Sequence, residues 1–128
     1  MTDRLTRYLS ERGYANHVVQ NGLEGLLQSW AEIVESVASG EVQYQDDYLN
    51  DMDGRRILEE ALAFVEPDQA ETVMERIRTA DTRILVHLVP TAGCIWGEEN
   101  ARKHGYSRDR DWWYYHRPRV VDETWRDR

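Results

Sequence analysis

The 128-residue sequence lacks the features of secreted and membrane-spanning chains. It contains a single cysteine, Cys94, so no internal disulfide can form. The longest apolar run, residues 84–86, resumes at 88–89 and is far shorter than the ~20 residues that a membrane helix needs. The first residues have no apolar core of the kind found in signal peptides. We therefore expect a cytoplasmic protein that has no membrane partner.

Aliphatic residues are also scarce, but aromatic residues compensate for them. Leu, Ile, Val and Phe together account for 27 of the 128 residues, and the mean hydropathy is −0.75. These values approach the level at which a highly charged chain stays disordered. Five tryptophans and seven tyrosines supply large rings that can bury much apolar area. The length suits one domain, so we predict a small, very polar, folded domain over residues 1–128.

Basic residues are the minority, and they are spread unevenly along the chain. There are 24 acidic against 16 basic residues, which gives a formal charge of −8. The formal charge is −2 over residues 1–40, −9 over residues 41–100 and +3 over residues 101–128. Duplex DNA and anionic membranes both need a positive surface, so an acidic chain is a poor partner for either. The sequence thus combines an acidic middle with a basic tail.

Apolar residues recur at steps of three and four along most of the chain, which is the spacing of amphipathic helices. The predicted helices span residues 3–12, 18–39, 46–65, 67–89 and 98–104. Gly22 and Gly25 weaken the second helix by roughly 1 kcal/mol each, so a break or a close helix contact near them is expected. Thr2 can cap the first helix and Asp46 or Asp47 the third, Pro67 suits the first position of the fourth, and Gly105 can close the fifth. The predicted fold class is mainly α, a single-domain bundle of four to five helices.

Two segments allow a different fold. Residues 83–89 are rich in strand formers and form a strand if the fourth helix ends before Pro90. Residues 112–115 show neither a helical nor an alternating pattern, and strand is slightly favoured there. The alternative fold is a small α+β domain with a short hairpin built from residues 83–89 and 112–116.

Signatures of catalysis and of metal binding are missing from the sequence. None of the four histidines has an Asp, Glu or His three or four residues away, as a helical metal site requires. The Asp-rich stretch around Gly54 can be aligned with a calcium loop, but Leu49 then takes the first ligand position and Arg55 adds positive charge. Cys94 has apolar neighbours, which favours a packed thiol over a nucleophile. We predict no cofactor, no metal and no catalytic residue.

Two segments are candidate partner-binding surfaces. The first comprises the carboxylates Asp46, Asp47, Asp51 and Asp53. They form either a solvated helix face or a negative surface that docks onto a basic partner. The second segment is the basic, aromatic tail, residues 106–128, with the candidate contact residues Trp112, Trp113, Tyr114, Tyr115 and Arg117.

Three interpretations of this tail differ in where the rings lie. As a latch, the tail is irregular and packs its rings on the helices, while its arginines approach the acidic middle of the chain. As a partner site, it exposes Trp112 or Tyr114, since Trp, Tyr and Arg are common interface anchors. As a nucleic-acid site, it stacks unpaired bases, although Asp109 and Asp111 inside the run disfavour this. The latch is the favoured interpretation.

The sequence favours a non-enzymatic, cytoplasmic bacterial module for protein–protein interaction. Its most concrete form is an acidic inhibitor, antitoxin or immunity-type protein that binds a basic partner by electrostatically steered association. One alternative is a small-ligand-binding domain or an enzyme with its site in the aromatic C-terminal segment. The other alternative is an accessory protein that binds single-stranded nucleic acid.

Overall fold

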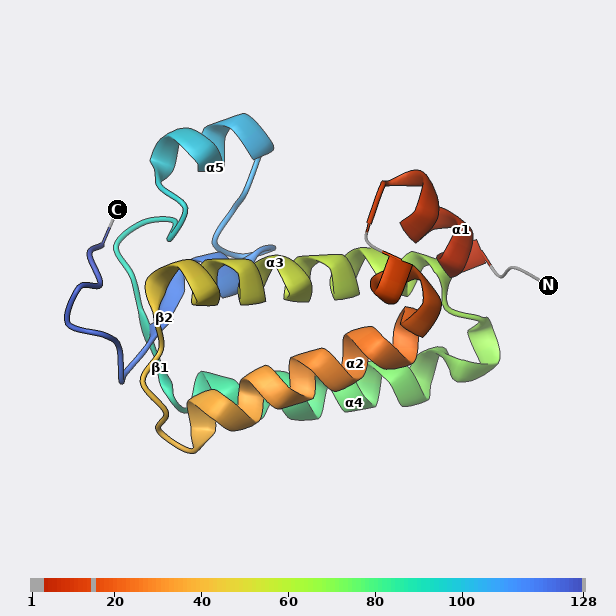
Figure 1. Ribbon diagram of the computed structural model, residues 1–128, viewed down its shortest axis with the longest axis horizontal. Helices are drawn as coiled ribbons and strands as arrows, with labels where there is room; N and C mark the ends of the chain where they lie inside the picture. The colour runs from red at the N-terminus through yellow and green to blue at the C-terminus, as the bar shows by residue number, and fades with distance from the viewer. Residues whose placement is uncertain (1–3, 15, 128) are drawn as a thin grey trace.

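The computed structural model describes residues 4–14 and 16–127, and all of their side chains except those of residues 16–20. This part of the chain is mainly helical, with five α-helices and one two-stranded antiparallel sheet, as the favoured fold class predicts. The elements are α1 (Arg4–Glu11), α2 (Asn16–Ala38), α3 (Gln45–Ala61), η1 (Leu62–Phe64), α4 (Pro67–Leu85), β1 (Leu88–Pro90), α5 (Glu98–His104), η2 (Trp112–Tyr114) and β2 (His116–Pro118). In Figure 1, α2, α3 and α4 form the body, while α1 and the C-terminal segment lie at opposite ends of α3.

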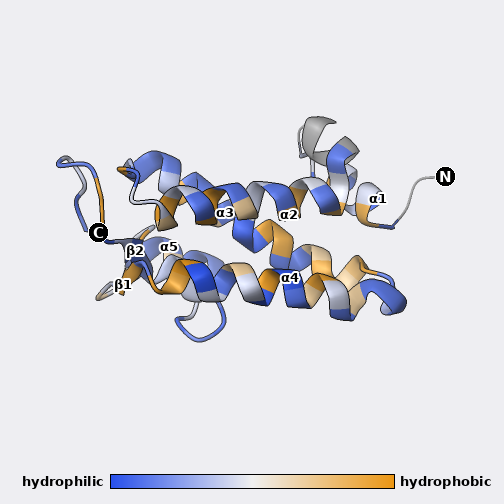
Figure 2. Ribbon diagram, turned by 90° about the horizontal axis from the view of Figure 1, so that it is seen from below, coloured by the Kyte–Doolittle hydropathy of each residue, from blue (hydrophilic) through white to orange (hydrophobic). Residues whose placement is uncertain are grey.

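The core lies between the amphipathic helices. Helix α2 packs against α1, α3 and α4, and its buried residues Leu27, Trp30, Val34 and Val37 follow steps of three and four. Hydrophobic and hydrophilic residues alternate along α3 and α4 in Figure 2. Each fully buried aliphatic side chain stabilises such a core by about 1.5–3 kcal/mol. The helical spacing of apolar residues therefore explains how α2, α3 and α4 pack together. No helix in the described ranges is long and apolar enough to cross a membrane.

Helix α2 bends at Gly22. The φ of 54° and ψ of −143° at this residue lie outside the helical region, in a region that residues other than glycine rarely adopt. The predicted break near Gly22 and Gly25 is thus confirmed at Gly22. On α1, Leu5 and Leu9 pack with Ala61 of α3 in a second, smaller core.

The helix ends agree with the sequence in part. Pro67 lies in the first turn of α4, and Gly105 closes α5 in the left-handed conformation, both as predicted. The N-cap residue of α3 is Tyr44, so the prediction that Asp46 or Asp47 caps this helix is wrong. Both aspartates lie in the first turn, where their charges face the partially positive helix N-terminus. The proposed cap of the first helix, Thr2, lies outside the described residues.

The predicted continuation of the fourth helix to Pro90 is wrong. Helix α4 ends at Leu85, and β1 pairs with β2 from the tail. The register joins Leu88 to Pro118, Val89 to Arg117 and Pro90 to His116. A hairpin therefore exists, but it is shorter than the alternative fold predicts, and residues 112–114 form a 3₁₀ turn rather than a strand. The pairing buries Leu88 and Pro118, and this tertiary gain outweighs local helical spacing.

Candidate functional site

Most rings of the tail lie inside the protein. Trp113, Tyr114 and Tyr115 are at most 7% exposed and belong to the main core, while Trp112 is half-buried. Because three of the four candidate rings have almost no accessible surface, we leave them out of any partner-binding surface. Arg117 is half-buried in β2 and donates a hydrogen bond to the carbonyl oxygen of Pro118 at 3.0 Å.

The buried rings close over an arginine of α3. The Arg55 side chain is only 3% exposed, and its guanidinium carbon lies 4.7 Å from the centre of the Trp113 ring. The same guanidinium donates to both carboxylate oxygens of Asp81 on α4, at 3.1 and 2.7 Å, and to Glu59 at 3.0 Å. The Trp30 indole N–H also donates to Asp81 at 3.0 Å. Ion pairing and cation–π contacts therefore join the tail to α2, α3 and α4.

A tail arginine reaches the acidic middle, as the latch interpretation expects, but it bonds carbonyl oxygens and not carboxylates. Arg108 donates to the carbonyl oxygens of Thr91 and Ala92, at 2.8 and 3.0 Å. Among the tail arginines of the described chain, the ion pair present is between Arg110 and its own neighbour Asp111, at 2.9 Å. The contact between tail and middle is thus reversed, because rings of the tail surround an arginine of the middle. The tail contact to a carboxylate of residues 41–100 comes from a hydroxyl, that of Tyr114, which donates to Asp53.

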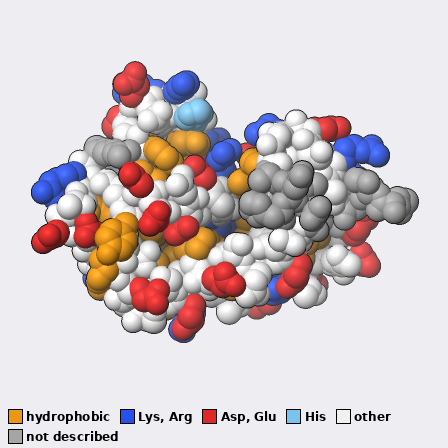
Figure 3. All heavy atoms as spheres, viewed as in Figure 1, with side chains coloured by type: hydrophobic (Ala, Val, Ile, Leu, Met, Phe, Trp, Pro, Cys, Tyr) orange, Lys and Arg blue, Asp and Glu red, His pale blue; other side chains and the backbone are white. Residues whose placement is uncertain are grey.

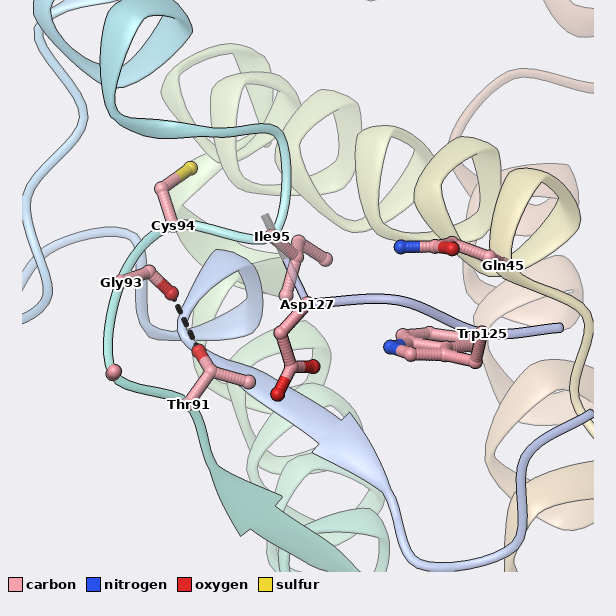
Figure 4. Close-up of a pocket in the computed structure, with 8 residues that line it drawn as sticks. Gln45, Thr91, Gly93, Cys94, Ile95, Trp125 and Asp127 are labelled. Carbon is pink, nitrogen blue, oxygen red and sulfur yellow. Dashed lines mark hydrogen bonds between the residues drawn. The ribbon is translucent and has the colours of Figure 1, made fainter. Parts of the chain in front are cut away.

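A clamp at the start of α3 holds the last described residues. The Gln45 side chain donates to the carbonyl oxygen of Arg126 at 2.5 Å and accepts the Arg126 backbone N–H at 3.0 Å. Trp125 lies beside Gln45 at a pocket of about 30 Å³, which suffices for about one water molecule. Figure 4 shows the Cys94 sulfur pointing away from the carboxylate of Asp127. Cys94 is fully buried, as expected of a packed thiol, and burial raises its pKa.

The four predicted carboxylates do not share one surface. Asp46 and Asp47 are exposed in the first turn of α3, and Asp51 lies half-buried one turn further on. Burial and the neighbouring charge of Asp47 raise the pKa of Asp51 to about 6. Asp53 lies elsewhere on the helix and accepts hydrogen bonds from Tyr114 at 2.5 Å and from the Trp96 indole at 3.3 Å. Among the described residues, no group of three or more His, Cys, Asp or Glu is arranged to hold a metal ion.

Exposed hydrophobic residues gather where α3 begins. Val42, Tyr44 and Val120 are 49%, 56% and 43% exposed, and we call these three residues the end patch. Two backbone hydrogen bonds join their segments: Gln43 N–H donates to the Val120 oxygen at 3.2 Å, and Asp122 N–H donates to the Gln43 oxygen at 2.9 Å. The sequence does not reveal this patch because residues 42–44 and 119–122 meet only in the folded chain. Exposed Leu85 and Val86, at the end of α4, lie near the same end, since Arg119 N–H bonds the His87 oxygen at 3.1 Å.

Carboxylates surround the end patch. The segments 41–47 and 119–126 carry five of them, Glu41, Asp46, Asp47, Asp122 and Glu123, against the two arginines Arg119 and Arg126. Figure 3 shows acidic side chains beside hydrophobic ones at this end of the molecule. The arrangement is an apolar centre with a mainly negative rim, which resembles the anatomy of a protein–protein interface.

A separate chain of hydrogen bonds runs along α3. Tyr8 of α1 donates to Glu60 at 2.5 Å, and Arg56 donates to Glu60 at 2.9 Å and to the Tyr114 hydroxyl at 3.2 Å. Tyr114 in turn donates to Asp53 at 2.5 Å. Asp53, Arg56 and Glu60 are three and four residues apart, so they share one face of the helix. That spacing can be seen in the sequence, but the contacts that Tyr8 and Tyr114 make with this face cannot.

The described part of the chain thus offers two candidate sites. They are the end patch with its rim and the hydrogen-bond network along α3. Comparisons with protein families, with curated proteins and with solved structures gave no match to this chain.

Proposed function

We propose that this protein is a non-enzymatic interaction module that binds a basic partner protein through the end patch and its acidic rim. Its most concrete form is an inhibitor, antitoxin or immunity-type protein. The observation that carries the proposal is the clustering of Val42, Tyr44 and Val120 beside five carboxylates. Exposed apolar residues scattered singly need no explanation, whereas a patch rimmed by charge is typical of binding surfaces.

The charge of this end favours a positive partner. Asp47 is exposed, and Asp51 next to it is half-buried and has a pKa that the charge of Asp47 helps to raise, so these two carboxylates repel each other. A lysine or arginine from a partner would stabilise both carboxylates. Such complementarity raises the association rate and excludes acidic partners.

The apolar centre supports the proposal independently of charge. Tyr44 is more than half exposed and immediately precedes α3, so its backbone is fixed by the helix while its ring faces solvent. Tyrosine presents a large rigid surface and is a frequent hot-spot residue in interfaces. Val42 and Val120 flank it on two paired segments, so the contact surface is preformed.

Affinity capture with a matched pair of variants tests the proposal. The full chain, immobilised, is exposed to native extract of its source organism, and the captured stoichiometric partner is purified. We expect this partner to be basic. Tyr44→Ser combined with Asp47→Lys should weaken its binding at least tenfold in calorimetry, because one hot-spot ring is lost and one charge is reversed.

The control changes the same chemistry elsewhere. Met74 is 47% exposed, lies outside the end patch and precedes the exposed Glu75 on α4. Met74→Ser combined with Glu75→Lys should leave the affinity unchanged. If both double variants weaken binding equally, or if the purified partner is acidic, the proposal is wrong.

A further inference from the structure

A polar cleft lies between α3 and α5. It has a volume of about 320 Å³ and is lined by Asp53, Arg56, Trp96, Asn100, His104 and Tyr106. A second hollow of about 270 Å³ shares Arg56, His104 and Tyr106 with it, so the two adjoin. We call the two hollows together the α3–α5 cleft. Their size is that of small-molecule sites, and Figure 3 shows the surface hollowed beside the raised α5.

Each charged side chain that lines this cleft forms an ion pair within the described chain, except that of Asp53. Arg56 pairs with Glu60 at 2.9 Å, Arg110 with Asp111 at 2.9 Å and Glu59 with Arg55 at 3.0 Å. Asp53 forms no ion pair with any residue of the described chain. It accepts hydrogen bonds from two neutral donors, the hydroxyl of Tyr114 and the indole N–H of Trp96. The cleft therefore holds one carboxylate whose position is fixed and which has no direct ion pair among the described residues, because Arg56 bonds the intervening Tyr114 hydroxyl instead.

Aromatic rings stand beside that carboxylate. The Tyr106 ring stacks on His104, with ring centres 5.3 Å apart, and lies tilted against Tyr114 at 4.5 Å, so its position is fixed. Trp96 also lines the cleft, and its indole N–H is bonded to Asp53. Ring faces carry negative potential and attract cations, as the carboxylate does. A phosphate or carboxylate ligand would instead place a second negative charge beside Asp53.

We propose that the α3–α5 cleft binds a small organic ammonium ion. The ammonium group pairs with Asp53, and the apolar part of the ligand lies against Trp96 and Tyr106. Charge-assisted hydrogen bonds and cation–π attraction act together here, in a hollow that is partly shielded from water. This site is distinct from the end patch, so the proposed function does not depend on it.

A set of three probes of similar shape tests the charge preference. The probes are 2-phenylethylammonium, the neutral 2-phenylethanol and the anionic 3-phenylpropionate, each titrated into the full chain. The indole N–H signal of Trp96, assigned with a Trp96→Phe variant, reports binding by NMR because this group bonds Asp53. We expect a saturable shift with the ammonium ion and affinity at least tenfold weaker for the other two. Equal binding of the alcohol, or tighter binding of the carboxylate, would overturn the proposal.

Substitutions inside and outside the α3–α5 cleft test whether the ammonium ion binds at Asp53. Asp53→Asn keeps an acceptor oxygen for Tyr114 and Trp96 but removes the charge, so it should weaken 2-phenylethylammonium at least tenfold. Asp47→Asn removes the same charge from the same helix outside the cleft and should change nothing. Asn100→Arg adds a positive charge at an exposed position of the rim and should also weaken binding. Unchanged affinity in Asp53→Asn would sink the proposal.

A fourth probe identifies the source of the ammonium group. Nα-acetyl-lysine methylamide carries the ammonium ion of a protein side chain. We expect it to bind no more tightly than 2-phenylethylammonium, whose ring can lie against Trp96. Binding at least tenfold tighter would mean that the cleft binds a lysine side chain of a protein. The proposal of a small-molecule ligand would then be wrong.

Discussion

Arg55 is the residue at which the tail meets the helical body. Its guanidinium is surrounded by the rings of Trp30, Trp112 and Trp113, at 4.7 to 5.9 Å, and is held by Asp81. A buried charge of this kind is costly unless it is paired and hydrogen-bonded. Asp81 on α4 meets both requirements, and the tail rings Trp112 and Trp113 cover the guanidinium. Arg55 therefore helps to specify how the tail packs.

Replacing Arg55 by methionine should destabilise the fold strongly. The substitution keeps the apolar bulk, but it leaves Asp81 without its cation while the Trp30 indole still donates to it. Removing one partner of a buried ion pair costs about 3–5 kcal/mol in the free energy of unfolding. Urea denaturation of the two chains measures the difference.

Two further variants show whether the ion pair is responsible. Arg55→Met combined with Asp81→Asn should cost less than the two single changes added together, because no charge is then left unpaired. Arg78→Met breaks an exposed pair with Glu75 and should cost less than about 1 kcal/mol. Additive costs for the first double variant would show that Arg55 acts through packing alone.

The sequence indicates an attraction between tail and middle but assigns the partners in reverse. Segment charges of −9 and +3 suggest that arginines of the tail meet carboxylates of the middle. In the structure Arg108 bonds carbonyl oxygens, while Trp113 covers Arg55. Charge counting cannot distinguish these cases, because rings attract cations without contributing to the formal charge.

At the scale of elements, the helices are predictable and the strands are not. The helix predicted over residues 18–39 is α2, which spans Asn16–Ala38, because its apolar stripe is long and regular. Strand β1 has three residues and depends on β2, which follows it 26 residues later in the chain. Residues 83–89 are rich in strand formers, but their apolar spacing also continues the fourth helix, so local sequence does not decide between the two. The end patch is unpredictable for the same reason, since it needs residues 42–44 beside 119–122.

Two glycine-to-alanine changes in helices should have opposite effects. Gly22 has a positive φ inside α2, so Gly22→Ala should destabilise the fold by about 1–3 kcal/mol. Gly54 lies within α3, and a methyl group on its Cα would meet open space, so Gly54→Ala should stabilise the fold by about 0.5–1 kcal/mol. Thermal unfolding of the two variants measures both signs. A stabilising Gly22→Ala would mean that α2 is straight in solution.

At the scale of the whole molecule, function and stability make opposite demands on the acidic end. The charges near Asp47 and Asp51 that would attract a basic partner repel one another in the free protein. Asp51 is half-buried next to Asp47, so neutralising either carboxylate removes their repulsion and stabilises the folded protein. A bound cation and a bound proton should therefore relieve the same repulsion. The pH dependence of the free energy of unfolding therefore measures this repulsion, which a positive partner would also relieve.

Replacing Asp51 by asparagine should stabilise the protein at pH 7.5 and have little effect at pH 4. Burial and the charge of Asp47 raise the pKa of Asp51 to about 6 from 3.8. Between these values the folded chain binds more protons than the unfolded chain, so the wild type gains stability as pH falls. After allowance for solvent screening, the gap should be about 1 kcal/mol.

Urea denaturation of wild type and Asp51→Asn at pH 4, 5, 6 and 7.5 follows how the gap closes. Asp122→Asn is the control with the opposite sign, because hydrogen bonds from Thr124 lower the pKa of Asp122. That group contributes stability above its unfolded pKa and loses it as pH falls, so its substitution should not stabilise the protein at pH 7.5. A constant gap between wild type and Asp51→Asn across this range would show that Asp51 does not titrate near pH 6. The repulsion proposed for the acidic end would then be absent.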